Sequence, residues 1–236
     1  MATNLHDGHR NRLRDEFLSL GENQTMHDHK LLEMLLFYAI PRKDTNPIAH
    51  ELINTFGSFA GVFDAEVEDL AKIKGMTKNA AVLIKSILPI ARAYIESKSD
   101  TNKCIKTFED MGSFFMAKYL GIKSETASML CLNGKGEILS FEVLSDGDLD
   151  STGLSIRTVL QQVIKTSATA VVIAHNHPSG VALPSPADVE ITKMVADALK
   201  TISVHLIDHI IIANNDYVSM AQSSKYEHIF KWQKSY

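Results

Sequence analysis

Apolar residues recur along the chain with two different periods, and the period changes around residue 100. In the first part they fall three or four residues apart, as on one face of an amphipathic helix. Pro41 and Gly57 end two of these stretches and Gly75 breaks a third, as expected of residues that stop helices. The pattern predicts an all-helical region with elements over residues 10–18, 30–38, 46–56, 67–73 and 78–95.

Beyond residue 105, helical periods alternate with short runs rich in β-branched residues. Such alternation is typical of an α/β sandwich around one mixed sheet. Asn133–Gly136 has the composition of a hairpin turn between the first two strands. Helices are expected over residues 109–120, 156–167 and from 185 onward, with a short one in 223–236, and strands over 126–132, 137–144, 168–175, 203–213 and 217–220.

Residues 98–104 are polar and lack an apolar period, so we interpret them as a linker. A chain of 236 residues is long enough for two small domains. We therefore expect a helical domain over residues 1–97 and an α/β domain over residues 105–236. Residues 145–153 are predicted to form an acidic, glycine-containing loop within the second domain.

A candidate metal site follows the strand predicted over residues 168–175. Side chains two apart in a strand point the same way, so His175 and His177 can aim at one point. Ser185 then predicts a helix cap, and Asp188 would lie on the first turn of that helix, facing back toward the imidazoles. Two imidazole nitrogens and one carboxylate oxygen suit zinc and leave a position for an activated water.

Simpler interpretations exist for each part of this pattern. Ser185 and Asp188 form a capping-box sequence that needs no metal. A lone His-x-His is common and by itself weak evidence of a ligand pair. The combination of a buried strand, His-x-His, a turn and a capped helix with an aspartate is far more specific than any one part.

The spacing of these residues resembles a known family. His-x-His, seven residues, Ser, two residues and Asp is the pattern of JAMM (MPN-plus) zinc metallopeptidases. The fuller run from His175 to Asp188, with Asn176, Pro178, Ser179 and Gly180, resembles the bacterial RadC family. The resemblance covers most of the chain and is strongest over residues 105–223, and it includes Gly147 ahead of the Arg157 helix, residues 206–212 and residues 217–219.

This resemblance implies a zinc-dependent hydrolase of an amide or isopeptide bond. His175, His177 and Asp188 would bind zinc, and Ser185 would help to stabilise the oxyanion. A glutamate on an early strand would be the general acid and base. The RadC family is also traditionally associated with DNA repair and recombination, which gives a second expected function, and a catalytically silent scaffold is a third.

Glu125 is the preferred candidate for the general base. It precedes the first predicted strand and matches the glutamate that RadC-like sequences carry there, counting back from Leu132. In this scheme it takes a proton from the zinc-bound water and later gives it to the leaving amine. Glu142, on the returning strand, is the second candidate, and a solvated glutamate at a strand start is the simpler interpretation of Glu125.

Several other polar residues allow more than one role. Asp208 and His209 are adjacent in a strand and should face opposite sides, so either could orient a metal ligand or make a buried hydrogen bond. Cys131 is expected in the core. Three histidines scattered among the first helices are interpreted as surface or hydrogen-bonded residues: His27, His29 and His50.

The segment from Leu70 to Ala81 resembles a helix-hairpin-helix motif, which holds a phosphate with backbone N–H groups. Gly75 matches the first glycine of the motif, but Thr77 stands at the second. A β-branched residue is poor where φ must be positive, so Thr77 is expected to cap the next helix instead. The residues that would contact DNA are Lys72, Lys74, Gly75 and Lys78.

The composition limits the classes of function. A formal net charge of −4 argues against a general nucleic-acid-binding surface but leaves room for a local basic patch. Two cysteines give no disulfide framework, and the sequence has no signal segment or membrane-length apolar run. We expect a cytoplasmic protein that binds zinc and a peptide or protein substrate, with DNA as a possible second partner and no membrane association.

Overall fold

The computed structural model describes residues 8–21, 24–98, 104–146, 155–178, 180–214 and 216–231. The chain falls into two compact units, residues 1–91 and 92–236, and the helix Lys78–Lys98 crosses the boundary between them. Most of the expected linker, residues 99–103, lies outside the described residues, as do Gly147 and most of the predicted loop, Ser179 and Trp232. Among the residues described, no helix has both the length and the apolarity needed to cross a membrane.

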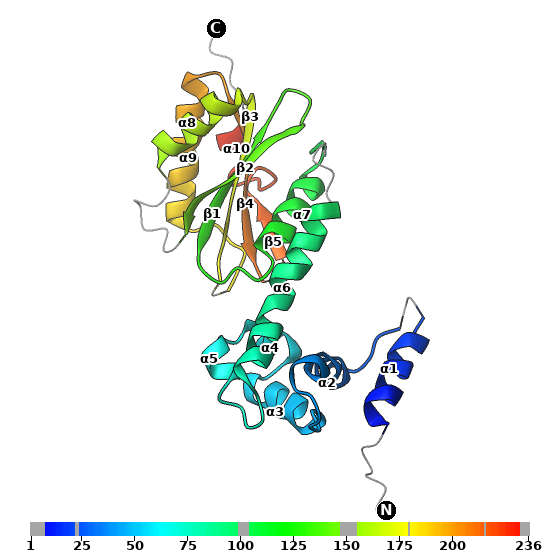
Figure 1. The fold of residues 1–236 in the computed structure, drawn as a ribbon. Helices are drawn as coiled ribbons and strands as arrows, with labels where there is room; N and C mark the ends of the chain where they lie inside the picture. Colours follow the sequence, from blue (N-terminus) through cyan, green and yellow to red (C-terminus); the bar gives the residue numbers. More distant parts are fainter. Residues whose placement is uncertain are drawn as a thin grey trace, which may run out of the picture. The chain divides into compact units, whose positions relative to one another are not determined.

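The first unit is helical, as the apolar period predicts (Figure 1). Its core is formed by side chains that include Leu32, Leu36, Leu52 and Ile84, all fully buried. Its helices are α1 (His9–Ser19), α2 (Asp28–Ala39), α3 (Asn46–Phe56), α4 (Phe59–Asp64), α5 (Val67–Leu70) and the first part of α6 (Lys78–Lys98).

Two details of this unit differ from the expectation. The six-residue helix α4 is absent from the predicted elements because it is too short to show a helical period, and Ser58 caps it by accepting a hydrogen bond from Gly61 N at 3.0 Å. The element expected over residues 67–73 is the single turn of α5, followed by turns up to Gly75.

The second unit contains a five-stranded mixed sheet in the order β2-β1-β3-β4-β5. Only β3 and β4 are parallel; the other neighbouring strands are antiparallel. The strands are β1 (Thr126–Leu132), β2 (Ile138–Asp146), β3 (Ala170–Asn176), β4 (His205–Ala213) and β5 (Asp216–Ser219), and the helices are α7 (Phe108–Tyr119), α8 (Ile156–Thr166), α9 (Pro186–Thr201) and α10 (Glu227–Phe230).

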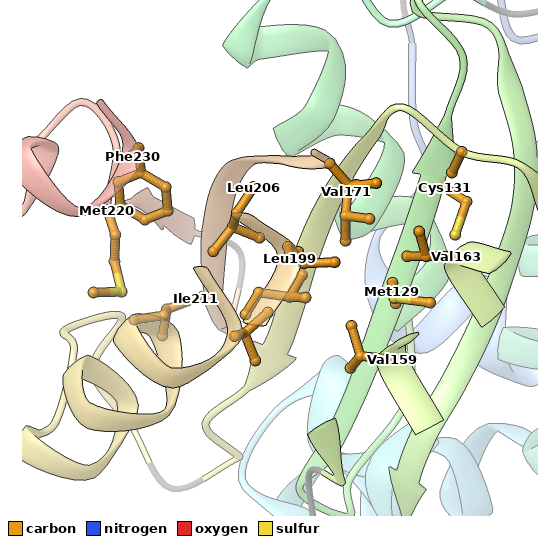
Figure 2. Close-up of a cluster of buried hydrophobic side chains, with 14 residues drawn as sticks. Met129, Cys131, Val159, Val163, Val171, Leu199, Leu206, Ile211, Met220 and Phe230 are labelled. Carbon is orange, nitrogen blue, oxygen red and sulfur yellow. The ribbon is translucent and has the colours of Figure 1, made fainter. Parts of the chain in front are cut away.

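Helices cover both faces of this sheet, and the strand residues alternate between the two cores. On one face, residues such as Val171 and Ile173 pack with α8, α9 and α10 (Figure 2). On the other face, Val172 and Ala174 pack with α7. Because the alternation has a period of two, the next odd-numbered residues after Ile173 point toward the α9 side.

Candidate metal centre

Strand β3 and the start of helix α9 bring together the two predicted histidines and the predicted aspartate. His175 continues the odd-numbered face of β3 and is 1% exposed. His177 follows the strand, and its backbone N donates to Ile212 O at 2.7 Å, which extends the pairing with β4. Ser185 caps α9: its Oγ accepts from Asp188 N at 3.1 Å, and the Asp188 carboxylate accepts from Ser185 N at 2.7 Å.

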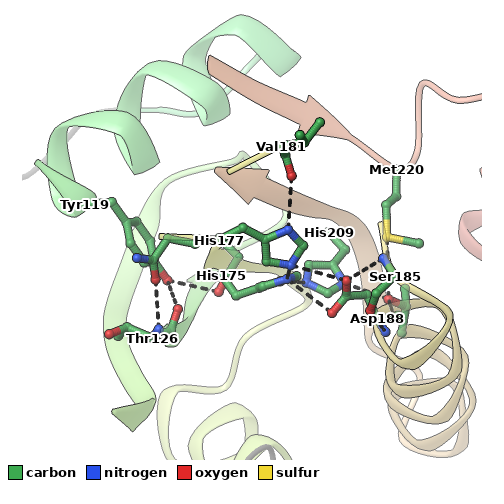
Figure 3. A network of polar contacts seen from close by, with 12 residues as sticks. Tyr119, Thr126, His175, His177, Val181, Ser185, Asp188, His209 and Met220 are labelled. Atoms are coloured by element: carbon green, nitrogen blue, oxygen red, sulfur yellow. Dashed lines mark hydrogen bonds and ion pairs between the residues drawn. The ribbon is translucent and has the colours of Figure 1, made fainter. Parts of the chain in front are cut away.

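The side chains of these three residues point toward one another (Figure 3). The Nε2 atoms of His175 and His177 are 2.8 Å apart. Oxygens of Asp188 lie 3.1 Å from His175 Nε2 and 3.5 Å from His177 Nε2. Ligands at normal zinc bond lengths in a tetrahedron stand about 3.3 Å apart. The two nitrogen–oxygen distances bracket this value, and the nitrogen–nitrogen distance is shorter than it.

The protonation of two of these groups also suits a metal ligand. His177 Nδ1 lies 3.2 Å from Val181 O, and because a carbonyl only accepts, the ring proton lies on Nδ1 and Nε2 is free to bind a metal. Burial tends to raise the pKa of Asp188, but that pKa is held below its usual range, and the hydrogen bonds from Ser185 contribute to this lowering.

Glu125 lies at the same centre. It immediately precedes β1, in which Ala127 is paired with His175. Extending that register by two residues places Glu125 opposite His177, on the same face of the sheet. Ligand atoms of Glu125, His175 and His177 all lie within 4.8 Å of one another.

The second candidate base is not brought to this centre. Glu142 is paired with Met129, four residues along β1 from Glu125. At the rise of a strand this is roughly 13 Å. The structure therefore leaves Glu125 as the glutamate close to the two imidazoles.

Asn176 fixes the segment that carries Glu125. It lies between the two histidines and points to the opposite face of β3. Its Oδ1 accepts from Thr126 N at 2.8 Å, and its Nδ2 donates to Ser124 O at 3.0 Å. The sequence did not indicate this role for Asn176. The available signal was an amide side chain directly after an apolar, β-rich run.

Asp208 and His209 face opposite sides, as predicted, and take different roles. His209 Nε2 lies 2.8 Å from His175 Nδ1, so His209 contacts a candidate ligand. Asp208 accepts hydrogen bonds from Ser219 Oγ and from Ala221 N, joining β4 to the end of β5 and to the segment that follows it. Burial raises the pKa of Asp208 to about 6.

The candidate DNA contacts belong to the other compact unit. Gly75 has a φ of +94°, and Thr77 caps α6 by accepting from Ala80 N at 3.1 Å, as its residue type predicts. Lys72 forms an exposed ion pair with Asp69 at 2.7 Å. The side chains of Lys74 and Lys78 are exposed.

Comparisons with known proteins identify the family of the chain. Residues 105–226 match the family model described as the RadC-like JAB domain. The UPF0758 protein FN0909 of Fusobacterium nucleatum subsp. nucleatum is 34% identical over 229 residues, which cover 94% of this chain and 98% of that protein. The matched family region contains the whole candidate metal centre. The chain therefore belongs to the RadC family, with a JAB-like domain in its second unit.

Proposed function

We propose that this protein is a zinc-dependent hydrolase that cleaves an amide or isopeptide bond in a peptide or protein substrate. The observation that carries the proposal is the convergence of His175 Nε2, His177 Nε2 and the Asp188 carboxylate within 3.5 Å of one another, with Glu125 beside them. The two histidines and Asp188 would hold the metal. The expected setting is the cytoplasm.

A bound zinc ion would supply a water of lowered pKa and polarise the substrate carbonyl. The Glu125 carboxylate would accept a proton from the attacking water as general base. The resulting carboxylic acid would donate that proton to the leaving amine nitrogen when the C–N bond breaks. The oxygen of Ser185 already accepts a hydrogen bond as the cap of α9, but its hydroxyl hydrogen can donate to the developing oxyanion.

The test combines metal content with hydrolysis of peptide and isopeptide substrates. Wild type should contain one zinc per chain. Glu125→Gln should retain zinc and lose activity by about 10²–10⁴-fold, because general acid–base catalysis contributes that much. Glu142→Gln is the matched control, since Glu142 lies further along the sheet. A wild-type protein that takes up no zinc, or equal activity in the two variants, would contradict the proposal.

DNA binding of the type associated with repair or recombination is the alternative proposal. The observation that favours it is the turn before α6, where Gly75 adopts a positive φ as the first glycine of such a hairpin would, although Thr77 caps the helix. Exposed lysines flank this turn, although Lys72 is already paired with Asp69. A helix start of this kind can present backbone N–H groups to a phosphate.

Binding to duplex and branched DNA at several salt concentrations tests this alternative. Replacing Lys72, Lys74 and Lys78 by alanine should make the slope of log binding constant against log salt concentration shallower by up to about 2.7. Each phosphate contact contributes about 0.9 to this slope. Replacing three exposed lysines of the second unit, Lys165, Lys193 and Lys200, changes the net charge equally and serves as the control. Equal slopes in both variants would count against DNA contact at the hairpin.

A further inference from the structure

A chain of hydrogen bonds runs behind the metal centre and connects two of its candidate ligands. His175 Nδ1 lies 2.8 Å from His209 Nε2. The other nitrogen of His209, Nδ1, lies 2.6 Å from Thr192 Oγ1. The Thr192 hydroxyl in turn contacts the backbone carbonyl of Asp188, one turn earlier in α9. The chain therefore begins at one ligand and ends at the backbone of another (Figure 3).

The partners of Thr192 determine where each proton lies. Besides His209, its Oγ1 contacts the Asp188 carbonyl and, at 3.7 Å, the Met220 sulfur. Both of these groups only accept, so the hydroxyl hydrogen is directed to them and an oxygen lone pair faces His209. His209 must then donate from Nδ1, which leaves its Nε2 without a hydrogen. His175 donates to that bare nitrogen from Nδ1, and His175 Nε2 is left free toward the metal centre.

Because the residues of this chain are buried, their hydrogens have no alternative arrangement. Thr192, His209 and His175 are 0%, 2% and 1% exposed, so water offers no alternative partners. The two ring nitrogens of His209 face Thr192 Oγ1 and His175 Nδ1. With the hydrogen on Nδ1 committed to Thr192, Nε2 is the acceptor for His175.

We propose that His209 and Thr192 are positioning residues that hold His175 in the tautomer and orientation needed for a metal ligand. This inference rests on the proposed zinc site. Metal-binding histidines usually donate their second nitrogen to a carboxylate, a carbonyl or water. Here a neutral imidazole takes that place. It fixes the ring of His175 without adding negative charge behind the metal.

The opposite tautomer of His209 would disable the site. If His209 donated from Nε2, His175 would have to accept at Nδ1 and carry its own hydrogen on Nε2. That hydrogen would point at the metal position and block binding. Thr192 therefore acts on the metal centre although it does not reach it.

Paired substitutions test each link through zinc affinity, measured by competition with a chromogenic chelator. His209→Leu removes the acceptor for His175, whereas His209→Gln offers a side-chain oxygen near the same place. Thr192→Val removes the hydroxyl that accepts from His209, whereas Thr192→Ser keeps it. We expect His209→Leu and Thr192→Val to weaken zinc binding by about 10–100-fold, the usual effect of losing an outer partner of a ligand. The Gln and Ser variants should recover most of the loss.

Long-range ¹H–¹⁵N NMR spectra of the histidine side chains provide the readout that a purely structural role would not change. In wild type, His175 and His209 should both carry their hydrogen on Nδ1, and His175 should lose this fixed tautomer in the Thr192→Val variant. If His209→Leu does not fold, the Thr192 pair and the wild-type spectrum still decide the question. A hydrogen on His175 Nε2 in wild type would overturn the inference.

The outcomes separate this inference from the function on which it rests. If wild type takes up no zinc, the proposed function itself fails. If wild type binds zinc, and His209→Leu and Thr192→Val bind it equally tightly with His175 still protonated on Nδ1, only the positioning role fails.

Discussion

Among the described residues, each compact unit contains a group of three neighbouring histidine rings. The group in the sheet unit, here the centre group, consists of His175, His177 and His209. The group in the helical unit, here the helical row, consists of His27, His29 and His50. The helical row lines a hollow of about 560 Å³ together with Asp28, so both groups combine imidazoles with an acidic residue.

The rings of the two groups are oriented differently. In the centre group, the planes of His175 and His177 are inclined by 62°, and those of His175 and His209 by 55°. In the helical row, His27 and His29 are inclined by only 10°, and His29 and His50 by 22°. The lone pair of an imidazole nitrogen lies in the plane of its ring. Inclined rings can therefore direct lone pairs to one point, whereas stacked rings direct them side by side.

This contrast teaches that the number and proximity of histidines do not define a metal site. The centre group lies on β3, on the residue that follows it and on β4, where β-sheet register fixes the position of each ring. The helical histidines are spread along the sequence, but packing of α2 against α3 places His50 over His29. His27 and His50 are exposed and His29 is half-buried.

The largest expected effect separates the two groups by zinc content. The His175→Ala/His177→Ala variant should fall from one zinc per chain to none, because two of three ligands are lost. The His27→Ala/His29→Ala/His50→Ala variant should keep one zinc per chain. Elemental analysis of both proteins measures this directly. Zinc lost from the second variant instead of the first would reverse the comparison.

Asp188 should show two separable effects, since it is both a candidate ligand and part of the cap of α9. Asp188→Ala should lower zinc affinity and reduce the unfolding free energy of the metal-free protein by about 1 kcal/mol, the usual cost of a lost cap. Asp188→Asn keeps an oxygen for Ser185 N and should preserve stability, while zinc affinity falls by more than about 100-fold, exceeding the usual effect of an outer partner. Chelator competition and urea unfolding distinguish the two losses; equal zinc affinity in wild type and Asp188→Asn would remove Asp188 from the ligand set.

Asp208 should make the stability of the sheet unit depend on pH, with higher stability at low pH. Its folded pKa of about 6 lies above the ordinary 3.8, so the folded state binds the proton more tightly than the unfolded state. The contribution to stability is therefore present at low pH and lost as pH rises through 6. Wild type, relative to Asp208→Asn, should gain about 1 kcal/mol on going from pH 7 to pH 5 in urea unfolding. A difference that does not change with pH would contradict this.

The smallest expected effect is the pH dependence of stability that the helical row contributes. Its sign is opposite to that of Asp208. Burial and the neighbouring rings of His50 and His27 lower the pKa of His29 in the folded state. The unfolded state then binds the proton more tightly, so stability falls as pH drops below the ordinary histidine value of about 6.5. His29→Gln should weaken this dependence in thermal melts between pH 7.5 and pH 5.5. An unchanged dependence would show that the pKa of His29 is not lowered in the folded state.

The sequence by itself determined the elements of both units and the identity of the candidate ligands. The apolar periods located most helices and strands because local patterning reflects which face is buried. The spacing from His175 to Asp188 located the centre because strand alternation and helix capping are local rules. Glu125 was found through the family resemblance and its place before a strand, and Thr77 was assigned as a cap from its residue type alone.

Only the tertiary structure decided how these residues meet. The antiparallel register of β1 and β3 placed Glu125 beside His177 and carried Glu142 away, and register is set by pairing between distant segments. The parallel pairing of β3 with β4 brought His209 behind His175, although 34 residues separate them. Ring orientation, which distinguishes the centre group from the helical row, likewise depends on packing between elements and has no counterpart in residue spacing.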